Sequence, residues 1–147
     1  MTPDVRTLYA VTEATWPPAT ATRAGPWTLR DGAGGGKRVS AATAEGDWRE
    51  EDVQAAETSM QMLGQDALFM LRDGEDDLDQ ALAMRGYEVI DPVNLWLCPI
   101  DRLTDTPVPR VTAFAIWEPL AIMLDIWAAG GIGDARIAVM ERASGPK

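Results

Sequence analysis

The sequence predicts an α+β fold, with a mixed, mainly antiparallel sheet and flanking helices. Several windows repeat apolar residues at the spacing of one helix face, and short strand-like runs lie between them. Glycine and proline separate these windows. A chain of 147 residues with 46% hydrophobic residues can bury a core without disulfides or metal ions.

The first expected element is a short helix near the N-terminus. Thr2 is suited to cap it, and Pro3 fits the first helical position, where its missing N–H costs nothing. Leu8, Val11 and Thr15 then recur at helical spacing before Pro17-Pro18 ends the helix.

The next expected element is a glycine-centred hairpin. Residues 27–30 are expected to form a strand, residues 31–36 a flexible turn, and residues 37–43 a returning antiparallel strand. After the hairpin we expect a helix over 49–63, a buried strand over 67–72 and a helix ending at Gly86. A strand over 87–99 and a proline-containing connector over 101–109 should follow. The last expected elements are a strand over 111–117, a helix from Leu120 through Trp127, and a helix capped by Asp134 that ends near Ala143.

Composition excludes several classes of function. The chain has no histidine and one cysteine, Cys98, which removes histidine-based triads and the common zinc sites, so we expect no metal centre. The net charge of −10 disfavours nucleic acid and anionic membranes as partners. The absence of a basic, apolar leader and the single cysteine favour a soluble cytoplasmic protein.

Acidic residues are concentrated in one band of the chain. Residues 45–91 carry 14 acids and three bases, whereas residues 1–44 carry three acids and five bases. The acidic band is typical of the solvated faces of two helices. The basic residues Arg30, Lys37 and Arg38 could instead gather near one another and hold a carboxylate or phosphate, or form salt bridges with the nearby acidic helices.

The run at residues 34–37, three glycines and a lysine, has two interpretations. Exposed amides followed by a lysine can cradle phosphate oxygens. However, a P-loop needs four residues between its glycines and a helix after its Gly-Lys-Ser/Thr, so a tight turn with positive φ angles is the stronger interpretation. Glu118 could similarly be a general base or complement a helix dipole, and Cys98 is read as a small buried hydrophobe.

Several short motifs occur in a characteristic order. They are Trp-Thr-Leu-Arg at 27–30, the glycines and bases at 34–38, Leu-Phe-Met-Leu-Arg at 68–72, and Arg-Gly-Tyr at 85–87 followed by Asp91-Pro92. Over about 65 residues this order resembles one branch of the Gcn5-related N-acetyltransferase (GNAT) superfamily, in the part that precedes a complete acetyltransferase domain.

The resemblance implies a division of the chain. Residues 1–105 would form a degenerate GNAT-like N-terminal domain, and residues 106–147 a linker with the opening strand and first two helices of an incomplete acetyltransferase domain. In GNAT domains the junction of those helices borders the acceptor-amine pocket. The resemblance therefore implies a substrate-facing segment containing Trp127, Gly130, Gly131, Ile132 and Arg136.

The resemblance also implies acetyl transfer from acetyl-CoA to a small-molecule or peptide amine. The family's pyrophosphate-binding turn, Arg/Gln-x-x-Gly-x-Gly/Ala, is absent from the chain, and no residue is assigned a catalytic role. We therefore expect this chain to be the N-terminal portion of a GNAT-related protein and to lack the acetyl-CoA site. The alternative is a non-catalytic binding or dimerisation module, forming a homodimer or docking against a catalytic domain.

Overall fold

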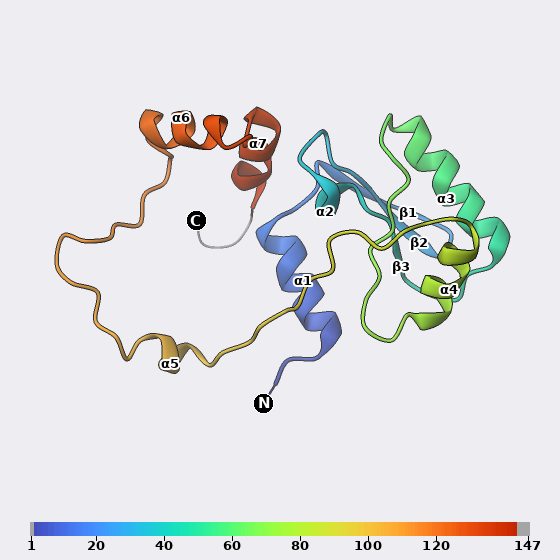
Figure 1. Ribbon diagram of the computed structural model, residues 1–147, viewed down its shortest axis with the longest axis horizontal. Helices are drawn as coiled ribbons and strands as arrows, with labels where there is room; N and C mark the ends of the chain where they lie inside the picture. Colours follow the sequence, from blue (N-terminus) through green and yellow to red (C-terminus); the bar gives the residue numbers. More distant parts are fainter. Residues whose placement is uncertain (1, 144–147) are drawn as a thin grey trace.

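The computed structural model describes residues 2–143 and has the α+β composition that the sequence predicts (Figure 1). A three-stranded antiparallel sheet in the order β1-β2-β3 lies between α1 on one side and α3 and α4 on the other. The elements are α1 (Val5–Thr15), β1 (Thr20–Ala24), β2 (Trp27–Asp31), α2 (Lys37–Ser40), β3 (Thr43–Ala44), α3 (Glu50–Met62), α4 (Asp76–Met84), α5 (Ile100–Leu103), α6 (Ala121–Ala129) and α7 (Asp134–Arg142).

The central strand β2 separates two chemically different faces of the sheet. Side chains alternate along a strand, so Trp27 and Leu29 share one face while Arg30 points to the other. Trp27 and Leu29 belong to the core, which buries apolar residues of α3 and α4. The core cluster consists of Trp27, Leu29, Ala42, Ala44, Val53, Ala56, Met60, Leu78 and Leu82.

The expected glycine hairpin is correct only in part. The strand over residues 27–30 is confirmed as β2, and it pairs with β3 so that Trp27 lies opposite Ala44. The strand over 37–43 is wrong, because Lys37–Ser40 forms the short helix α2 and only Thr43–Ala44 is strand. The longer partner of β2 is β1, which the sequence did not predict and which reaches it through Gly25, with φ +58°.

Residues 67–72 were expected to be a buried strand, but they form no strand. One parallel bridge joins Phe69 to Ala42, and the segment is half-buried. The backbone N–H of Ala42 donates to Leu68 O and that of Met70 to Ala42 O. This segment therefore contacts the sheet edge over too short a length to extend the sheet.

The helices α3 and α4 agree with the sequence pattern. The first turn of α3 is acidic, which suits the positive end of a helix dipole, and Asp52 accepts a hydrogen bond from the Arg49 N–H. The glycines expected to stop the two helices, Gly64 and Gly86, have φ of +72° and +88°. This left-handed conformation is the usual helix terminus and favours glycine.

The first helix begins later than expected. Its N-cap is Asp4, whose side chain accepts a hydrogen bond from Thr7 N at 2.7 Å, and not Thr2. Asp4 can reach the first free amides of the helix, which lie two to three residues ahead of a cap. The expected end before Pro17-Pro18 is confirmed by the last helical residue, Thr15.

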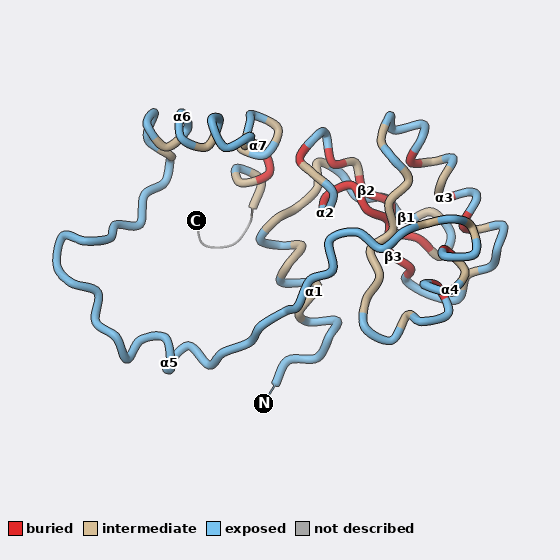
Figure 2. Tube along the Cα trace, viewed as in Figure 1, coloured by how far each residue is buried: buried red, intermediate tan, exposed pale blue. Residues whose placement is uncertain are grey.

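The expected strands over 87–99 and 111–117 are wrong. We call residues 88–120 the arm: it contains only α5 and is exposed along almost its whole length (Figure 2). Strand-like sequence forms a strand only when another strand satisfies its backbone groups, and the described residues provide the arm with no such neighbour. Cys98, expected to be buried, is exposed.

Beyond the arm, the helices α6 and α7 agree with the predicted positions. Asp134 is the first residue of α7 and Gly133 is its N-cap, one residue earlier than expected. Helix α7 packs against residues 32–36, which we call the glycine loop. A Cβ at Gly35 would lie 2.5 Å from Val139 Cγ2, and Val139 itself is fully buried. Because Gly35 has no side chain, the glycine loop leaves room for Val139 of α7.

We predict that Gly35→Ala lowers stability by about 1–3 kcal/mol, because the added methyl group overpacks the contact with Val139. Amide hydrogen exchange across α7 should become faster, and chemical unfolding should give the loss of stability. Gly46→Ala is the matched control, since a Cβ at Gly46 meets no atom within 4 Å. Equal exchange rates in α7 of both variants would contradict the proposed role of Gly35.

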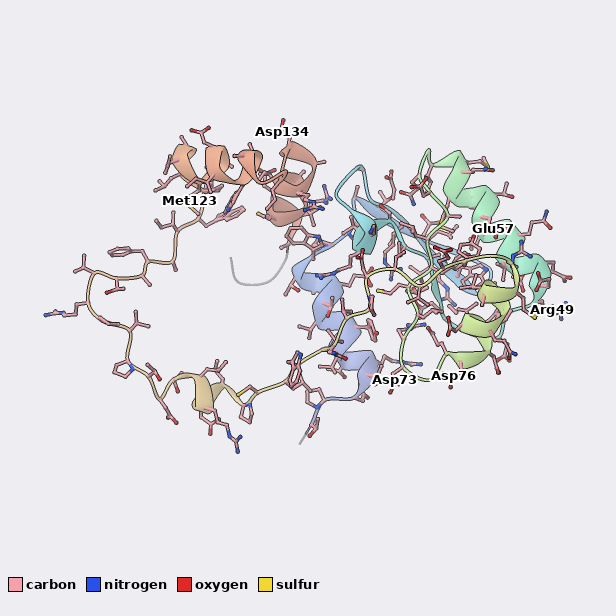
Figure 3. All side chains as sticks on the ribbon, viewed as in Figure 1. Arg49, Glu57, Asp73, Asp76, Met123 and Asp134 are labelled. Atoms are coloured by element: carbon pink, nitrogen blue, oxygen red, sulfur yellow. The ribbon has the colours of Figure 1, made fainter. Side chains whose placement is uncertain are left out.

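A polar contact joins α3 to the end of α4. The carboxylate of Glu57 accepts hydrogen bonds from Arg85 at 2.7 Å and from the Tyr87 hydroxyl at 2.8 Å. Figure 3 labels Glu57 on α3. The hydrogen bond from Arg85 lowers the pKa of Glu57, and the Tyr87 bond adds to the effect against partial burial. The single carboxylate of Glu57 on α3 thus binds both Arg85 and Tyr87 at the end of α4, and this contact holds the two helices together.

We predict that this contact makes stability fall as the solution becomes acidic. The folded-state pKa of Glu57 lies below its ordinary value of 4.5, so the stabilisation is complete above that pH and disappears as the pH falls through the folded-state pKa. Urea unfolding of the natural chain and of Glu57→Gln should differ at neutral pH and converge at low pH. Glu88→Gln, at an exposed site in the arm, is the control and should follow the natural chain.

Candidate functional site

The face of the sheet that points away from the core carries a buried arginine. Arg30 is 4% exposed and donates to both carboxylate oxygens of Glu13 on α1, at 3.0 and 3.1 Å. Its remaining terminal nitrogen donates to Ala41 O and Thr43 Oγ1, each at 3.0 Å. A two-pronged arginine–carboxylate contact is geometrically specific, so it fixes α1 across this face.

A second arginine organises the neighbouring part of the same face. Arg72 donates to Glu75 at 2.8 Å, forms an ion pair with Glu45 at 3.5 Å, and donates to the carbonyl oxygen of Ala44. Partial burial acts to raise the pKa of Glu45, but the Thr43 hydroxyl and the Arg72 charge outweigh it and lower that pKa. Glu45 is therefore held as a carboxylate.

These groups form the inner wall of a pocket of about 160 Å³ between α1 and the sheet. Helix α1 supplies one wall, and the strands with the segment after Ala67 supply the other. Burial, followed by the charge of Glu75, raises the pKa of Tyr9 in this pocket, so its hydroxyl is kept as a donor. The lining residues are Arg6, Tyr9, Ala10, Thr12, Glu13, Trp16, Pro18, Arg30, Arg38, Thr43, Glu45, Met70 and Arg72.

The structure brings together two of the three bases considered for anion binding. Arg30 and Arg38 line the same pocket. Lys37 instead forms an exposed ion pair with Asp91 at 2.6 Å. The donors of Arg30 are mostly engaged by Glu13, Ala41 and Thr43, whereas Arg38 has no hydrogen-bond or ion-pair partner within the described residues 2–143.

The segment that the family resemblance implies as substrate-facing lies elsewhere. Trp127, Gly130, Gly131 and Ile132 form the junction of α6 and α7, where Gly131 has φ +82° and Ile132 N donates to Trp127 O at 2.8 Å. Arg136, on α7, lies beside Gly36 in the glycine loop. None of these five residues lines the pocket beside α1.

Glu118, considered as a general base, lines a separate hollow of about 460 Å³ with Trp117, Pro119, Leu124, Ile137 and Glu141. This hollow is bounded by the end of the arm and by α6 and α7. Its two acids share it with mainly apolar neighbours, and the five implied acceptor residues are not among its lining.

Sequence reasoning missed most of the pocket beside α1. Arg6, Tyr9 and Glu13 were not considered as site residues, and Trp16 was considered only as one of six tryptophans that could line a pocket or pack in the core. The spacing of three to four between these four residues places them on one face of a helix. The mixture of charged and aromatic residues on this helix face was the one sequence feature that could have indicated the pocket. The opposing residues Glu45 and Arg72 come from distant parts of the chain, and no spacing relates them to α1.

Within residues 2–143, the structure contains no group of three or more acidic or cysteine side chains that could hold a metal ion. None of the described helices has the length and apolar character needed to cross a membrane. Comparison of the sequence and structure with protein-family models, curated proteins and solved structures finds no match in any of the three.

We predict that Glu13→Gln lowers stability by about 1–3 kcal/mol, because the buried guanidinium of Arg30 loses its charged partner. Urea unfolding measures the change. Glu51→Gln is the matched control, since Glu51 pairs with Arg49 on the surface, where such pairs contribute roughly 0–1 kcal/mol. Equal losses in the two variants would show that the Arg30–Glu13 contact has no special role.

Proposed function

We propose that this chain is the N-terminal, accessory part of a GNAT-related N-acetyltransferase, and that its arm and α6 dock against the catalytic part of that protein. The complete protein would transfer an acetyl group from acetyl-CoA to a small-molecule or peptide amine. The chain itself would supply a folded α+β unit and a docking surface. The ordered motifs from Trp27 to Pro92 support the family assignment.

The observation that carries the docking proposal is the exposure of α6. Its sequence, Ala-Ile-Met-Leu-Asp-Ile-Trp-Ala-Ala, is apolar around nearly the whole helix, yet none of its residues is buried. Ile122 and Ile126 are 60% and 63% exposed. A helix that is apolar on all sides is normally enclosed by protein, so α6 is suited to a partner surface.

The arm supports the same proposal. Figure 3 shows side chains of the arm extending into open space and labels Met123 in the first turn of α6. Large apolar side chains that are exposed close together on a protein surface typically mark interaction sites. The exposed large apolar side chains of the arm are Val89, Ile90, Val93, Leu95, Trp96, Leu97, Ile100, Leu103, Val108, Val111, Phe114, Ile116, Trp117 and Leu120.

The two strand-like segments of the arm, which form no strand in this structure, support a specific mode of docking. Residues 87–99 and 111–117 have strand-forming composition, and their backbone groups would be satisfied by strands of an acetyltransferase domain. Addition of strands at a sheet edge is a common mode of recognition, in which backbone hydrogen bonds provide affinity. The same contact would cover α6 and shape the acceptor-amine pocket near Trp127 and Arg136.

A homodimerisation module is the second candidate. The observation that favours it is the packing of α7 on the glycine loop at the end of a long exposed arm. An element attached in this way can exchange between two copies, which is a common route to dimers. A dimer that persists on dilution, measured by light scattering, would favour this candidate over docking to a catalytic domain.

We predict that acetyl-CoA does not raise the melting temperature of the 147-residue chain, because the pyrophosphate-binding turn is absent from it. The reading frame beyond codon 147 should encode a strand, Arg/Gln-x-x-Gly-x-Gly/Ala and a helix. A longer chain containing that motif should show an acetyl-CoA-dependent thermal shift, with free CoA and adenosine as controls.

Two results would contradict the proposal in different ways. A thermal shift in the 147-residue chain would show that the cofactor site is already present. A stop codon directly after codon 147, with no shift in acetyl-CoA, would remove the acetyltransferase assignment and leave the dimerisation module.

A further inference from the structure

Of the four arginines that line the pocket beside α1, two have no hydrogen-bond or ion-pair partner among residues 2–143, although the charge of Arg6 acts on Asp4 at the start of α1. Arg6, on α1, and Arg38, on α2, both line the pocket. Among residues 2–143, neither guanidinium has a hydrogen-bonded or ion-pair partner. Of the other two arginines of the pocket, Arg30 donates to Glu13, whereas Arg72 donates to Glu75 and forms an ion pair with Glu45.

The acids of the pocket are already neutralised by these pairs. Glu13 accepts both of its hydrogen bonds from Arg30, and Glu45 accepts from Thr43 at 2.8 Å and lies against Arg72. Two positive charges therefore remain at the opening, on elements far apart in the sequence. Other arginines, such as Arg102 and Arg110, also have no ion pair among residues 2–143, and Arg6 and Arg38 differ from them because both line one pocket.

From this arrangement we propose that the pocket binds a small oxyanion, a carboxylate or phosphate group, between the guanidiniums of Arg6 and Arg38. Planar guanidinium groups donate paired hydrogen bonds to carboxylate and phosphate oxygens. The Tyr9 hydroxyl and the Trp16 ring, which also line the pocket, border the same space and can contact the body of the ligand.

The size of the pocket limits the ligand. A volume of about 160 Å³ is well below the roughly 300–1,000 Å³ of pockets that enclose drug-sized molecules. A phosphate ion or a short dicarboxylate fits this space, whereas a whole nucleotide or acetyl-CoA does not. The inference of an oxyanion site does not depend on the proposed function.

The test is calorimetric titration of the full 147-residue chain at low ionic strength with inorganic phosphate, with succinate, and with neutral succinamide as the uncharged probe. We expect saturable heat with at least one of the two anions and none with succinamide. The anion that binds more tightly identifies the phosphate or carboxylate source. Binding should weaken as salt is added, because the two guanidiniums are exposed.

Matched variants locate the site. Arg6→Gln and Arg38→Gln should each weaken binding by about tenfold, since each removes a charge-assisted hydrogen bond. Arg102→Gln, at an exposed arginine of α5, should bind as the natural chain does. Thermal melting checks that each variant is folded, and because Arg6 and Arg38 lie on different helices, one variant suffices if the other fails to fold.

Nuclear magnetic resonance provides a second readout. The Nε–H signals of Arg6 and Arg38 should shift during the anion titration, while that of Arg102 stays in place. Absence of saturable heat with both anions, or equal binding by the natural chain and the two pocket variants, would overturn the proposal.

Discussion

The sheet and the helices α1, α3 and α4 form the packed unit of the chain, and this unit depends on the burial of Trp27. Its indole N–H donates to Asp52 O at 2.8 Å, which joins β2 to the first turn of α3. Its ring meets Phe69 edge-on at 5.3 Å, and Phe69 meets Tyr87 in the same way at 5.5 Å. One buried aromatic therefore connects the sheet, α3, the segment after Ala67 and the end of α4, while satisfying its own polar group.

The alternation of β2 then creates the opposite, polar face. With Trp27 and Leu29 directed into the core, Arg30 must point toward α1, and Glu13 on α1 and Thr43 on β3 accept its hydrogen bonds. A buried guanidinium is tolerated only with such partners, so α1 is placed by hydrogen bonding as much as by apolar contact.

The second half of the chain buries far fewer of its apolar side chains than the first half. Helix α7 contacts the glycine loop through Val139, but the arm and α6 leave large apolar side chains in water. Exposure of this kind costs free energy unless another surface covers it, since burial stabilises by about 25 cal/mol per Å² of apolar area. The residues around the sheet therefore maintain a packed core and a pocket, whereas the arm and α6 leave their apolar side chains exposed.

Local signals in the sequence determined β2, the two acidic helices with their glycine ends, and α6 and α7. Helical periodicity, Gly64 and Gly86 act within a few residues, so these features are readable without tertiary context. The tertiary structure decided which strand-like segments became strands: β1 found a partner in β2, whereas residues 87–99 and 111–117 did not. It also decided the candidate site. There Arg6 and Arg38, from two separate helices, line one pocket with Glu45 and Arg72, which come later in the sequence. Strand pairing and pocket formation both depend on contacts between residues far apart in the chain, and local spacing carries no record of those contacts.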